Sequence, residues 1–113
     1  METAEITRIA VAALEDIKGK DITVMDVRHM TSLFDTMIVA SGDSTRQVKA
    51  LADNVREKLK EAGVDILGTE GEQASEWVLV DAINVIVHVM HPTARQHYNL
   101  EELWGAARNR RAA

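Results

Sequence analysis

Apolar residues recur every three or four positions over the first seventeen residues, which is the spacing of a helix that buries one face. They are Ile6, Ile9, Ala10, Ala13, Leu14 and Ile17. We expect Gly19 to cap the C-terminus of this helix. A second helix is predicted to begin at Ser44, because Ser44 and Gln47 have the spacing of a capping box, and to end at Gly63. Its buried face is expected to consist of Val48, Leu51, Ala52, Val55 and Leu59.

Short apolar runs alternate with these helical segments. Residues 22–27 and 36–40 are predicted to be strands joined by a loop over 28–34, and residues 66–70 are a weaker strand candidate. The first two runs are too apolar for half-exposed strands, so we expect them in central positions of a sheet. The order of strand, glycine-containing turn, capped helix and further strand predicts a crossover unit of the α/β class.

Residues 77–81 and 85–90 are the strongest strand candidates, and the short segment between them predicts a hairpin. A turn at Ala82 and Ile83 predicts these cross-strand pairs: Asp81 with Asn84, Leu79 with Ile86, and Trp77 with His88. One face would then carry only valines, namely Val78, Val80, Val85, Val87 and Val89. The other face would carry Trp77, Leu79, Asp81, Asn84, Ile86 and His88. This mixture is typical of the centre of a protein-binding surface. Two interpretations stay open: this mixed face docks onto a partner, or a helix covers it and buries Trp77.

The C-terminal part predicts one more helix. Pro92 is expected to stop the preceding strand, and the pair Asn99 and Glu102 indicates a helix start, with the helix running through residue 107. We expect a single domain over residues 1–113, with a core at 4–104 and a basic tail at 105–113. The tail contains Arg108, Arg110 and Arg111.

Composition narrows the classes of function. A chain of 113 residues has the usual size of one domain. Only 4% of the residues are aromatic while 46% are hydrophobic, so the core must be mainly aliphatic. The net charge of −5 argues against binding exposed nucleic acid and favours a basic protein as partner. Because no secretory signal and no apolar run of about 18 residues are present, we expect a cytoplasmic protein without membrane contact.

Two segments could carry phosphate or nucleotide chemistry. The turn at 41–44 follows a strand and precedes a helix, so its backbone N–H groups could hold an anion. It lacks the glycine and lysine patterns of nucleotide-binding loops, and a capped strand-to-helix turn explains it. Glu70 and Glu72 are the only acidic pair separated by one residue. Nucleotidyl transfer needs clustered carboxylates that hold metal ions, and no such cluster is visible.

The absence of cysteine excludes disulfides, thiolate metal sites and cysteine nucleophiles. His88, His91 and His97 could ligate a metal, yet no nearby carboxylate completes a convincing ligand set. One histidine in the sheet and two on the surface explain them. We therefore expect no catalytic residue, no metal and no cofactor.

Several segments follow one another in an order that resembles a known family. They are residues 21–27 (DITVMDV), 35–42 (DTMIVASG), 47–48 (QV), 70–71 (EG), 77–81 (WVLVD), 85–89 (VIVHV) and 98–104 (YNLEELW). The combination is similar to the ribosomal silencing factor family, also called RsfS or Iojap-like, over about residues 4–104.

The resemblance implies an α/β fold: a small mixed sheet of about five strands flanked by helices, with a nucleotidyltransferase-like topology but without catalytic residues. It implies a protein that is no enzyme. Such a protein would bind large-subunit ribosomal protein fourteen on the large ribosomal subunit, block joining with the small subunit and repress translation when nutrients are limiting. The free protein would form a homodimer. The basic tail extends past the family core, and two interpretations of it stay open: a minor contact with ribosomal RNA, or no role. The alternative to a silencing factor is a nucleotide- and metal-dependent nucleotidyltransferase-like enzyme.

For the ribosomal contact we expect Trp77 as the anchor, with Leu79, Asp81 and His88 around it. Arg95 and Tyr98 mark a second candidate contact region. The complete set of expected partner-binding residues is Trp77, Leu79, Asp81, His88, Arg95, Tyr98 and Glu70.

Overall fold

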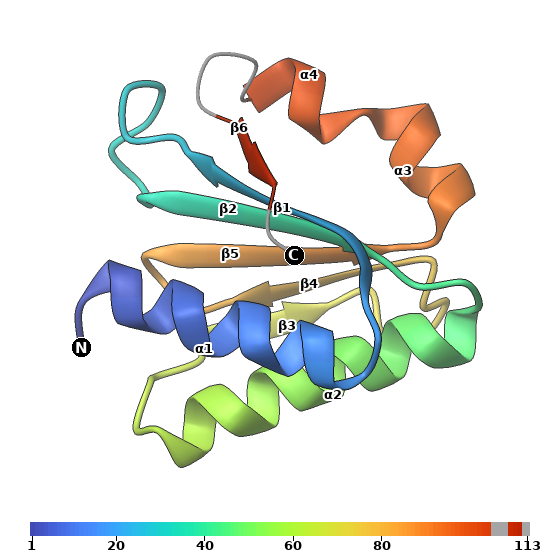
Figure 1. Cartoon of the computed structure of the whole chain (residues 1–113), viewed down its shortest axis with the longest axis horizontal. Coiled ribbons are helices and arrows are strands. Elements are labelled where there is room, and N and C mark those ends of the chain that lie inside the picture. Colours follow the sequence, from blue (N-terminus) through green and yellow to red (C-terminus); the bar gives the residue numbers. More distant parts are fainter. Residues whose placement is uncertain (105–108, 112–113) are drawn as a thin grey trace.

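Helices cover both faces of a six-stranded sheet in the computed structural model, which describes residues 1–104 and 109–111 (Figure 1). The elements are α1 (Thr3–Asp16), β1 (Lys20–Asp26), β2 (Thr36–Ser41), α2 (Thr45–Glu61), β3 (Gly68–Glu70), β4 (Trp77–Asp81), β5 (Val85–Met90), α3 (Pro92–Tyr98), α4 (Leu100–Trp104) and β6 (Asn109–Arg111). The strands lie in the order β3-β4-β5-β2-β1-β6. β2 and β5 are parallel and all other neighbours are antiparallel. The predicted α/β fold with a mixed sheet flanked by helices is confirmed.

The sheet is formed by the five predicted strands and by one that the sequence did not predict. The backbone of β6 pairs antiparallel with β1, where Arg111 lies opposite Thr23. β2 is buried along its whole length and β1 only in part. The crossover unit is also present, because α2 carries the chain from β2 across the sheet to β3 at its far edge. Residues 105–107 of the predicted last helix, and 108 and 112–113 of the tail, lie outside the described residues.

The end of α1 corrects one prediction. Lys18, and not Gly19, adopts the left-handed conformation that terminates the helix, with a φ of 62°. The N–H groups of Lys18 and Gly19 donate to the carbonyls of Glu15 and Leu14 at 3.0 and 2.8 Å, which is a Schellman arrangement. Gly19 is needed for space instead, since an added Cβ would lie 3.0 Å from the Leu14 carbonyl oxygen and 3.2 Å from Leu51.

The start of α2 follows the prediction closely. Ser44 Oγ accepts a hydrogen bond from the N–H of Gln47 at 3.1 Å, and Gln47 Oε1 accepts one from the N–H of Asp43 at 2.7 Å. The helix ends at Glu61, and Gly63, two residues further on, takes the left-handed φ of 85° that terminates it. The cap explains the preceding turn without a bound anion.

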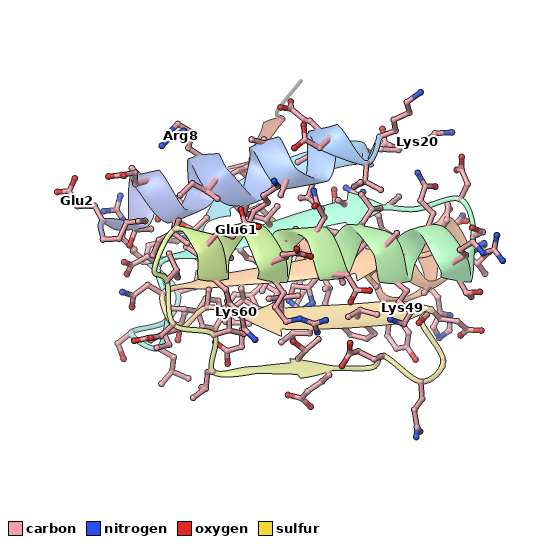
Figure 2. The ribbon with its side chains drawn as sticks, turned by 90° about the horizontal axis from the view of Figure 1, so that it is seen from below. Glu2, Arg8, Lys20, Lys49, Lys60 and Glu61 are labelled. Carbon is pink, nitrogen blue, oxygen red and sulfur yellow. The ribbon has the colours of Figure 1, made fainter. Side chains whose placement is uncertain are left out.

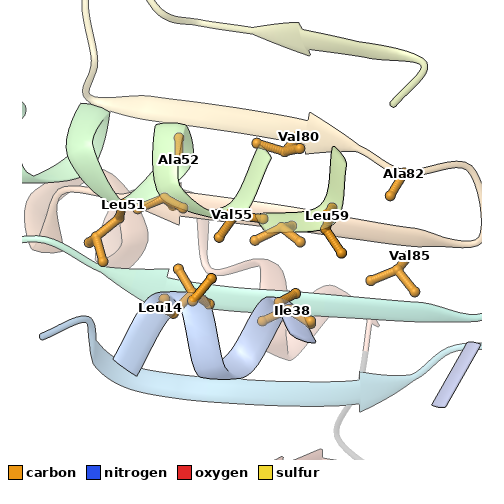
Figure 3. Packing of buried hydrophobic residues seen from close by; sticks show 14 of the residues in the cluster. Leu14, Ile38, Leu51, Ala52, Val55, Leu59, Val80, Ala82 and Val85 are labelled. Carbon is orange, nitrogen blue, oxygen red and sulfur yellow. The ribbon is translucent and has the colours of Figure 1, made fainter. Parts of the chain in front are cut away.

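α1 and α2 pack on one face of the sheet and bury an aliphatic core (Figure 3). Its fully buried members include Leu14, Ile38, Leu51, Val55, Leu59, Val80 and Val85. The outer sides of the two helices carry charged side chains such as Arg8, Lys49 and Glu61 (Figure 2). This amphipathic pattern is the one that the helical spacing predicted.

The β4–β5 hairpin contains the predicted strands in a different register. Leu79 lies opposite His88 and Trp77 lies opposite Met90, so the predicted pairs are wrong by two residues. The turn is made one residue later than expected: Ile83 takes a φ of 71°, and the N–H of Ala82 donates to the carbonyl of Val85 at 3.0 Å. A shift of two residues keeps each side chain on its predicted face, so the valines still point into the α1–α2 core.

The opposite face of the sheet carries α3 and α4 (Figure 1). The sequence did not predict α3, because Pro92 was interpreted only as a strand stop. Pro92 in fact occupies the first turn of α3, where its missing N–H costs nothing. The N–H of Thr93 donates to Nδ1 of His91 at 3.3 Å, so His91 caps the helix. Asn99 adopts a left-handed conformation between the two helices and, as predicted, its Oδ1 accepts from the N–H of Glu102, at 3.4 Å.

Candidate functional site

A groove of about 480 Å³ opens on the α3–α4 side of the sheet. Its floor comes from β2, β4 and β5, and α4 and the loop between β1 and β2 contribute to its walls. We call it the apolar groove; its lining residues are Leu33, Phe34, Met37, Leu67, Leu79, Asp81, Ile83, Ile86, His88, Leu100 and Trp104. Asp81 is the one lining residue with a carboxylate, and the others except His88 are hydrophobic.

Large hydrophobic side chains at the rim of the apolar groove are exposed. Leu33 is 79% exposed, Leu67 71% and Ile83 47%. The rings of Phe34 and Trp104 lie 5.6 Å apart and join the β1–β2 loop to α4. A continuous exposed apolar surface of this kind is uncommon on a monomer and typically marks a binding site.

Trp77 and His88 form a hydrogen-bonded pair beside the apolar groove. Nε1 of Trp77 donates to Nδ1 of His88 at 2.9 Å. Tyr98 of α3 packs against Trp77 with ring centroids 4.7 Å apart and the ring planes tilted by 45°. Trp77 is half-buried and His88 is only 5% exposed. Burial lowers the pKa of His88 from 6.5 to about 4, because the charged ring would lose its hydration. The interpretation that a helix covers this face holds for its Trp77 end, which α3 covers, whereas its Leu79 end is open; docking of a partner there stays a prediction.

Asp81 lies at the hairpin end of the apolar groove. Its Oδ1 accepts a hydrogen bond from the N–H of Ile83 at 2.8 Å, which stabilises the left-handed conformation of that residue. The exposed Ile83 side chain is thereby placed beside Asp81 in the groove lining. No sequence pattern predicts an isoleucine in this conformation, which is strained for a β-branched side chain.

Arg95, which the sequence analysis assigns to a second candidate contact region, forms an internal hydrogen-bond network in the structure. Its side chain is only 11% exposed and donates two hydrogen bonds to the Glu101 carboxylate, at 2.9 and 3.0 Å. It also donates to Ser41 Oγ at 2.9 Å and to Thr23 Oγ1 at 3.1 Å. Arg95 therefore joins α3, α4, β1 and β2, and it holds the helix that forms one wall of the apolar groove.

Apart from Arg95, the predicted partner-binding residues separate into three places. Leu79, Asp81 and His88 line the apolar groove. Trp77 and Tyr98 form an adjacent aromatic pair, and Tyr98 is 54% exposed. Glu70 is exposed on the edge strand β3, where it pairs with Leu79 through the backbone.

The sequence-based prediction missed the rim of the apolar groove. Leu33, Leu67 and Ile83 were assigned to a loop, a weak strand and a turn. Each is a large apolar residue in a segment that connects elements. Their position in connecting segments was the one sequence feature that could have indicated exposed apolar side chains, because such segments lie at the surface.

The segments considered for chemistry have structural explanations. An added Cβ on Gly42 would lie 2.9 Å from the backbone nitrogen of Val48, so that glycine allows α2 to approach β2. Gly71 has a φ of 88°, and an added Cβ would collide with the Trp77 carbonyl oxygen. Glu72 forms an ion pair with Arg56 at 3.0 Å.

Within residues 1–104 and 109–111, no group of three or more metal-ligating side chains converges. No helix in the same part of the chain is long and apolar enough to cross a membrane.

The fold and the groove define a small mixed-sheet α/β protein with an exposed apolar groove on one face of the sheet. Residues 1–113 match the family described as "Ribosomal silencing factor during starvation". The ribosomal silencing factor RsfS of Chromobacterium violaceum is 63% identical over 105 residues, which is 93% of this chain and 86% of that protein. RsfS of Haemophilus influenzae is 45% identical over 91 residues, covering 80% and 89% of the two chains. A crystal structure of a Chromobacterium violaceum protein superimposes with a TM-score of 0.92 at 59% identity, over 100% of this chain and 94% of that one.

The chain belongs to the ribosomal silencing factor family. The resemblance found in the sequence is thus confirmed. With it, the expected class of function is confirmed, namely ribosome-associated regulation of translation.

Proposed function

We propose that the protein represses translation by binding the large ribosomal subunit and blocking its association with the small subunit. The partner on the large subunit is ribosomal protein fourteen, and the complex forms in the cytoplasm when nutrients are short. The family description, which names ribosomal silencing and starvation, supports this proposal. The observation that carries it is the apolar groove with its exposed rim, because it offers a binding surface on a chain of regulatory type.

The anatomy of the apolar groove suits a protein partner. A hydrophobic centre surrounded by polar groups is the usual arrangement of a protein–protein interface. A few buried anchors provide most of the binding energy in such an interface. The exposed side chains of Leu33, Leu67 and Ile83 are free to become such anchors, because the fold leaves them uncovered.

Charge favours the same class of partner. The chain carries a net charge of −5, and Asp81 adds a carboxylate to the groove lining. An acidic protein associates faster with a basic surface and is repelled by exposed phosphates. A basic ribosomal protein therefore fits this chain better than bare ribosomal RNA does. The RNA contact proposed for the tail remains secondary to the protein contact.

Steric blocking requires no chemistry from this chain. The enzymatic alternative, a nucleotide- and metal-dependent transferase, finds little support in the described residues. Glu70 is exposed on an edge strand, and Glu72 is engaged by Arg56. A nucleotide that bound the folded protein would stabilise it by about 2.7 kcal/mol at one hundred times its dissociation constant. We expect magnesium with nucleoside triphosphate to leave the melting temperature unchanged, and a rise of several degrees would favour the enzyme.

Sedimentation with separated ribosomal subunits tests the proposal. The protein should sediment with large subunits and not with small subunits, and its addition before mixing should lower the yield of joined ribosomes. Leu67→Lys introduces a charge at the groove rim and should abolish both effects. Leu103→Lys is the matched control, because Leu103 is 67% exposed on α4 but does not line the groove. Equal binding to both subunits, or equal effects of the two substitutions, would contradict the proposal.

The expected homodimer of the free protein offers a second measurement. A dimer that used the apolar groove would have to dissociate before the ribosome binds. Equilibrium sedimentation of the Leu67→Lys and Leu103→Lys variants then shows whether the dimer interface includes the apolar groove. Loss of the dimer only in the first variant would place both interfaces on the groove.

A further inference from the structure

His88 presents an unused hydrogen-bonding group beside the apolar groove. Its Nδ1 accepts from Trp77, whereas its Nε2 is buried and has no hydrogen-bond partner among the described residues. An unpaired buried polar atom is costly, and native proteins contain few of them. Such an atom in a binding surface therefore calls for a partner from outside the chain.

The bond from Trp77 determines which hydrogen His88 carries. A neutral imidazole has one N–H and one acceptor nitrogen. Nδ1 is the acceptor, because the indole N–H of Trp77 can only donate. The hydrogen of the neutral ring is therefore on Nε2, and the unused group is a donor.

The ring also has a definite orientation. Nδ1 and Nε2 lie on opposite sides of the line from Cβ through the ring. Trp77, which faces Nδ1, does not line the apolar groove, whereas Leu79 and Ile86 do. Nε2 therefore lies on the side of the ring away from Trp77. His88 itself is a lining residue although its side chain is almost completely buried.

We infer that the Nε2–H of His88 is a recognition donor, and that the partner inserts an apolar side chain accompanied by an uncharged oxygen acceptor. The inference rests on the proposed docking function and specifies the chemistry of the occupant. The acceptor is a backbone carbonyl or a side-chain amide oxygen. A carboxylate would enter a largely apolar groove that already contains Asp81, and like charges at low polarity repel strongly. Small rearrangements of interface side chains, which are common on binding, give the oxygen access to Nε2.

Two substitutions test the two nitrogens of the His88 ring separately. In His88→Asn the amide oxygen can replace Nδ1 as the acceptor for Trp77, but nothing replaces the Nε2 donor. In His88→Gln the amide N–H₂ can replace Nε2, but the Trp77 acceptor is lost. The first variant should therefore keep its fold and bind weakly, and the second should be less stable and bind well.

The experiment measures the affinity of both variants for purified large subunits, together with their unfolding in denaturant. We expect His88→Asn to bind about ten-fold more weakly than the unsubstituted protein, which is the effect of one lost hydrogen bond. His88→Gln should bind within about three-fold of it. The ¹⁵N chemical shifts of the His88 ring in the free protein should show the Nε2-protonated form. A ring protonated on Nδ1 would overturn the inference.

Leu67→Lys separates failure of this inference from failure of the proposed function. If His88→Asn binds normally while Leu67→Lys does not, the groove is the docking surface and the recognition donor is wrong. If neither substitution weakens binding, the groove is not the docking surface, and both proposals fall.

Discussion

On one face of the sheet, helices of 14 and 17 residues cover an aliphatic core whose central side chains have no solvent exposure. On the other face, helices of 7 and 5 residues cover methionine and aromatic side chains and leave the apolar groove open. We call these the covered face and the open face. This difference fits the proposed function, because the covered face buries the larger core and the open face leaves apolar side chains exposed.

The kinds of side chain also differ between the two faces. Aliphatic residues such as Val55 and Leu59 pack densely and specify one arrangement. The open face instead combines buried methionines with tryptophan and histidine, whose rings carry polar N–H groups. Met37, Met90 and Trp104 belong to this second cluster. The comparison predicts that substitutions on the two faces will affect different measurements.

Leu59→Ala on the covered face should have the largest effect on stability. Leu59 is fully buried, so its truncation removes apolar contacts and leaves a cavity. We expect a loss of about 3–4 kcal/mol in the free energy of unfolding, measured in denaturant. Affinity for large subunits should stay unchanged under conditions where the variant is folded. A loss below about 1 kcal/mol would contradict the idea that the covered face supplies most of the stability.

Acid should destabilise the open face through His88. The folded-state pKa of about 4 lies below the ordinary value of 6.5, so the unfolded chain binds a proton that the folded protein excludes. Stability should therefore fall as the pH drops from about 6.5 to 4, by roughly 3 kcal/mol in total. Titrating carboxylates add their own pH dependence, so the measured quantity is the difference between the unsubstituted protein and His88→Asn. Equal pH profiles would contradict the burial effect.

Trp77→Ala should weaken both stability and binding, because Trp77 packs against α3 and also contacts His88, which lines the apolar groove. It packs against Tyr98 and donates to His88, so we expect a loss of about 2–3 kcal/mol in the free energy of unfolding. Trp77→Phe keeps an aromatic ring at this position and removes only the N–H, so it should cost about 1 kcal/mol. Measuring both unfolding and large-subunit binding for the two variants shows whether Trp77 contacts the partner directly or only stabilises the fold. Near-normal stability of Trp77→Ala with weak binding would make it the predicted anchor.

Arg95→Met should have the smallest effect of these substitutions on unfolding, about 1–2 kcal/mol. The change removes the hydrogen bonds that hold α3 and α4 to the sheet and preserves the apolar stem of the side chain. Hydrogen exchange should increase in α4 and not in α2. Exchange that stays unchanged in α4 would show that Arg95 does not hold the wall of the apolar groove.

Much of the covered face could be predicted from the sequence. Helical spacing identified the buried side chains of α1 and α2, and the Ser44 cap located the start of α2. These features depend on residues within a few positions of one another. The hairpin shows the limit of such local patterns. Its faces were right because alternation has a period of two, whereas its register was wrong because the conformation of Ile83 decides the turn.

The open face depended on tertiary structure. No local pattern could show that α3 and α4 are too short to cover the sheet, or that Leu33 and Leu67 meet across one groove. Arg95 was expected at a contact surface, and only its packing against Ser41 and Glu101 revealed a structural role. By itself the sequence determined the longer helices, the five principal strands, their buried sides and the family resemblance, whereas α3 and β6 were recognised only in the structure. Which apolar residues stay exposed was decided in three dimensions, because exposure depends on what distant segments leave uncovered.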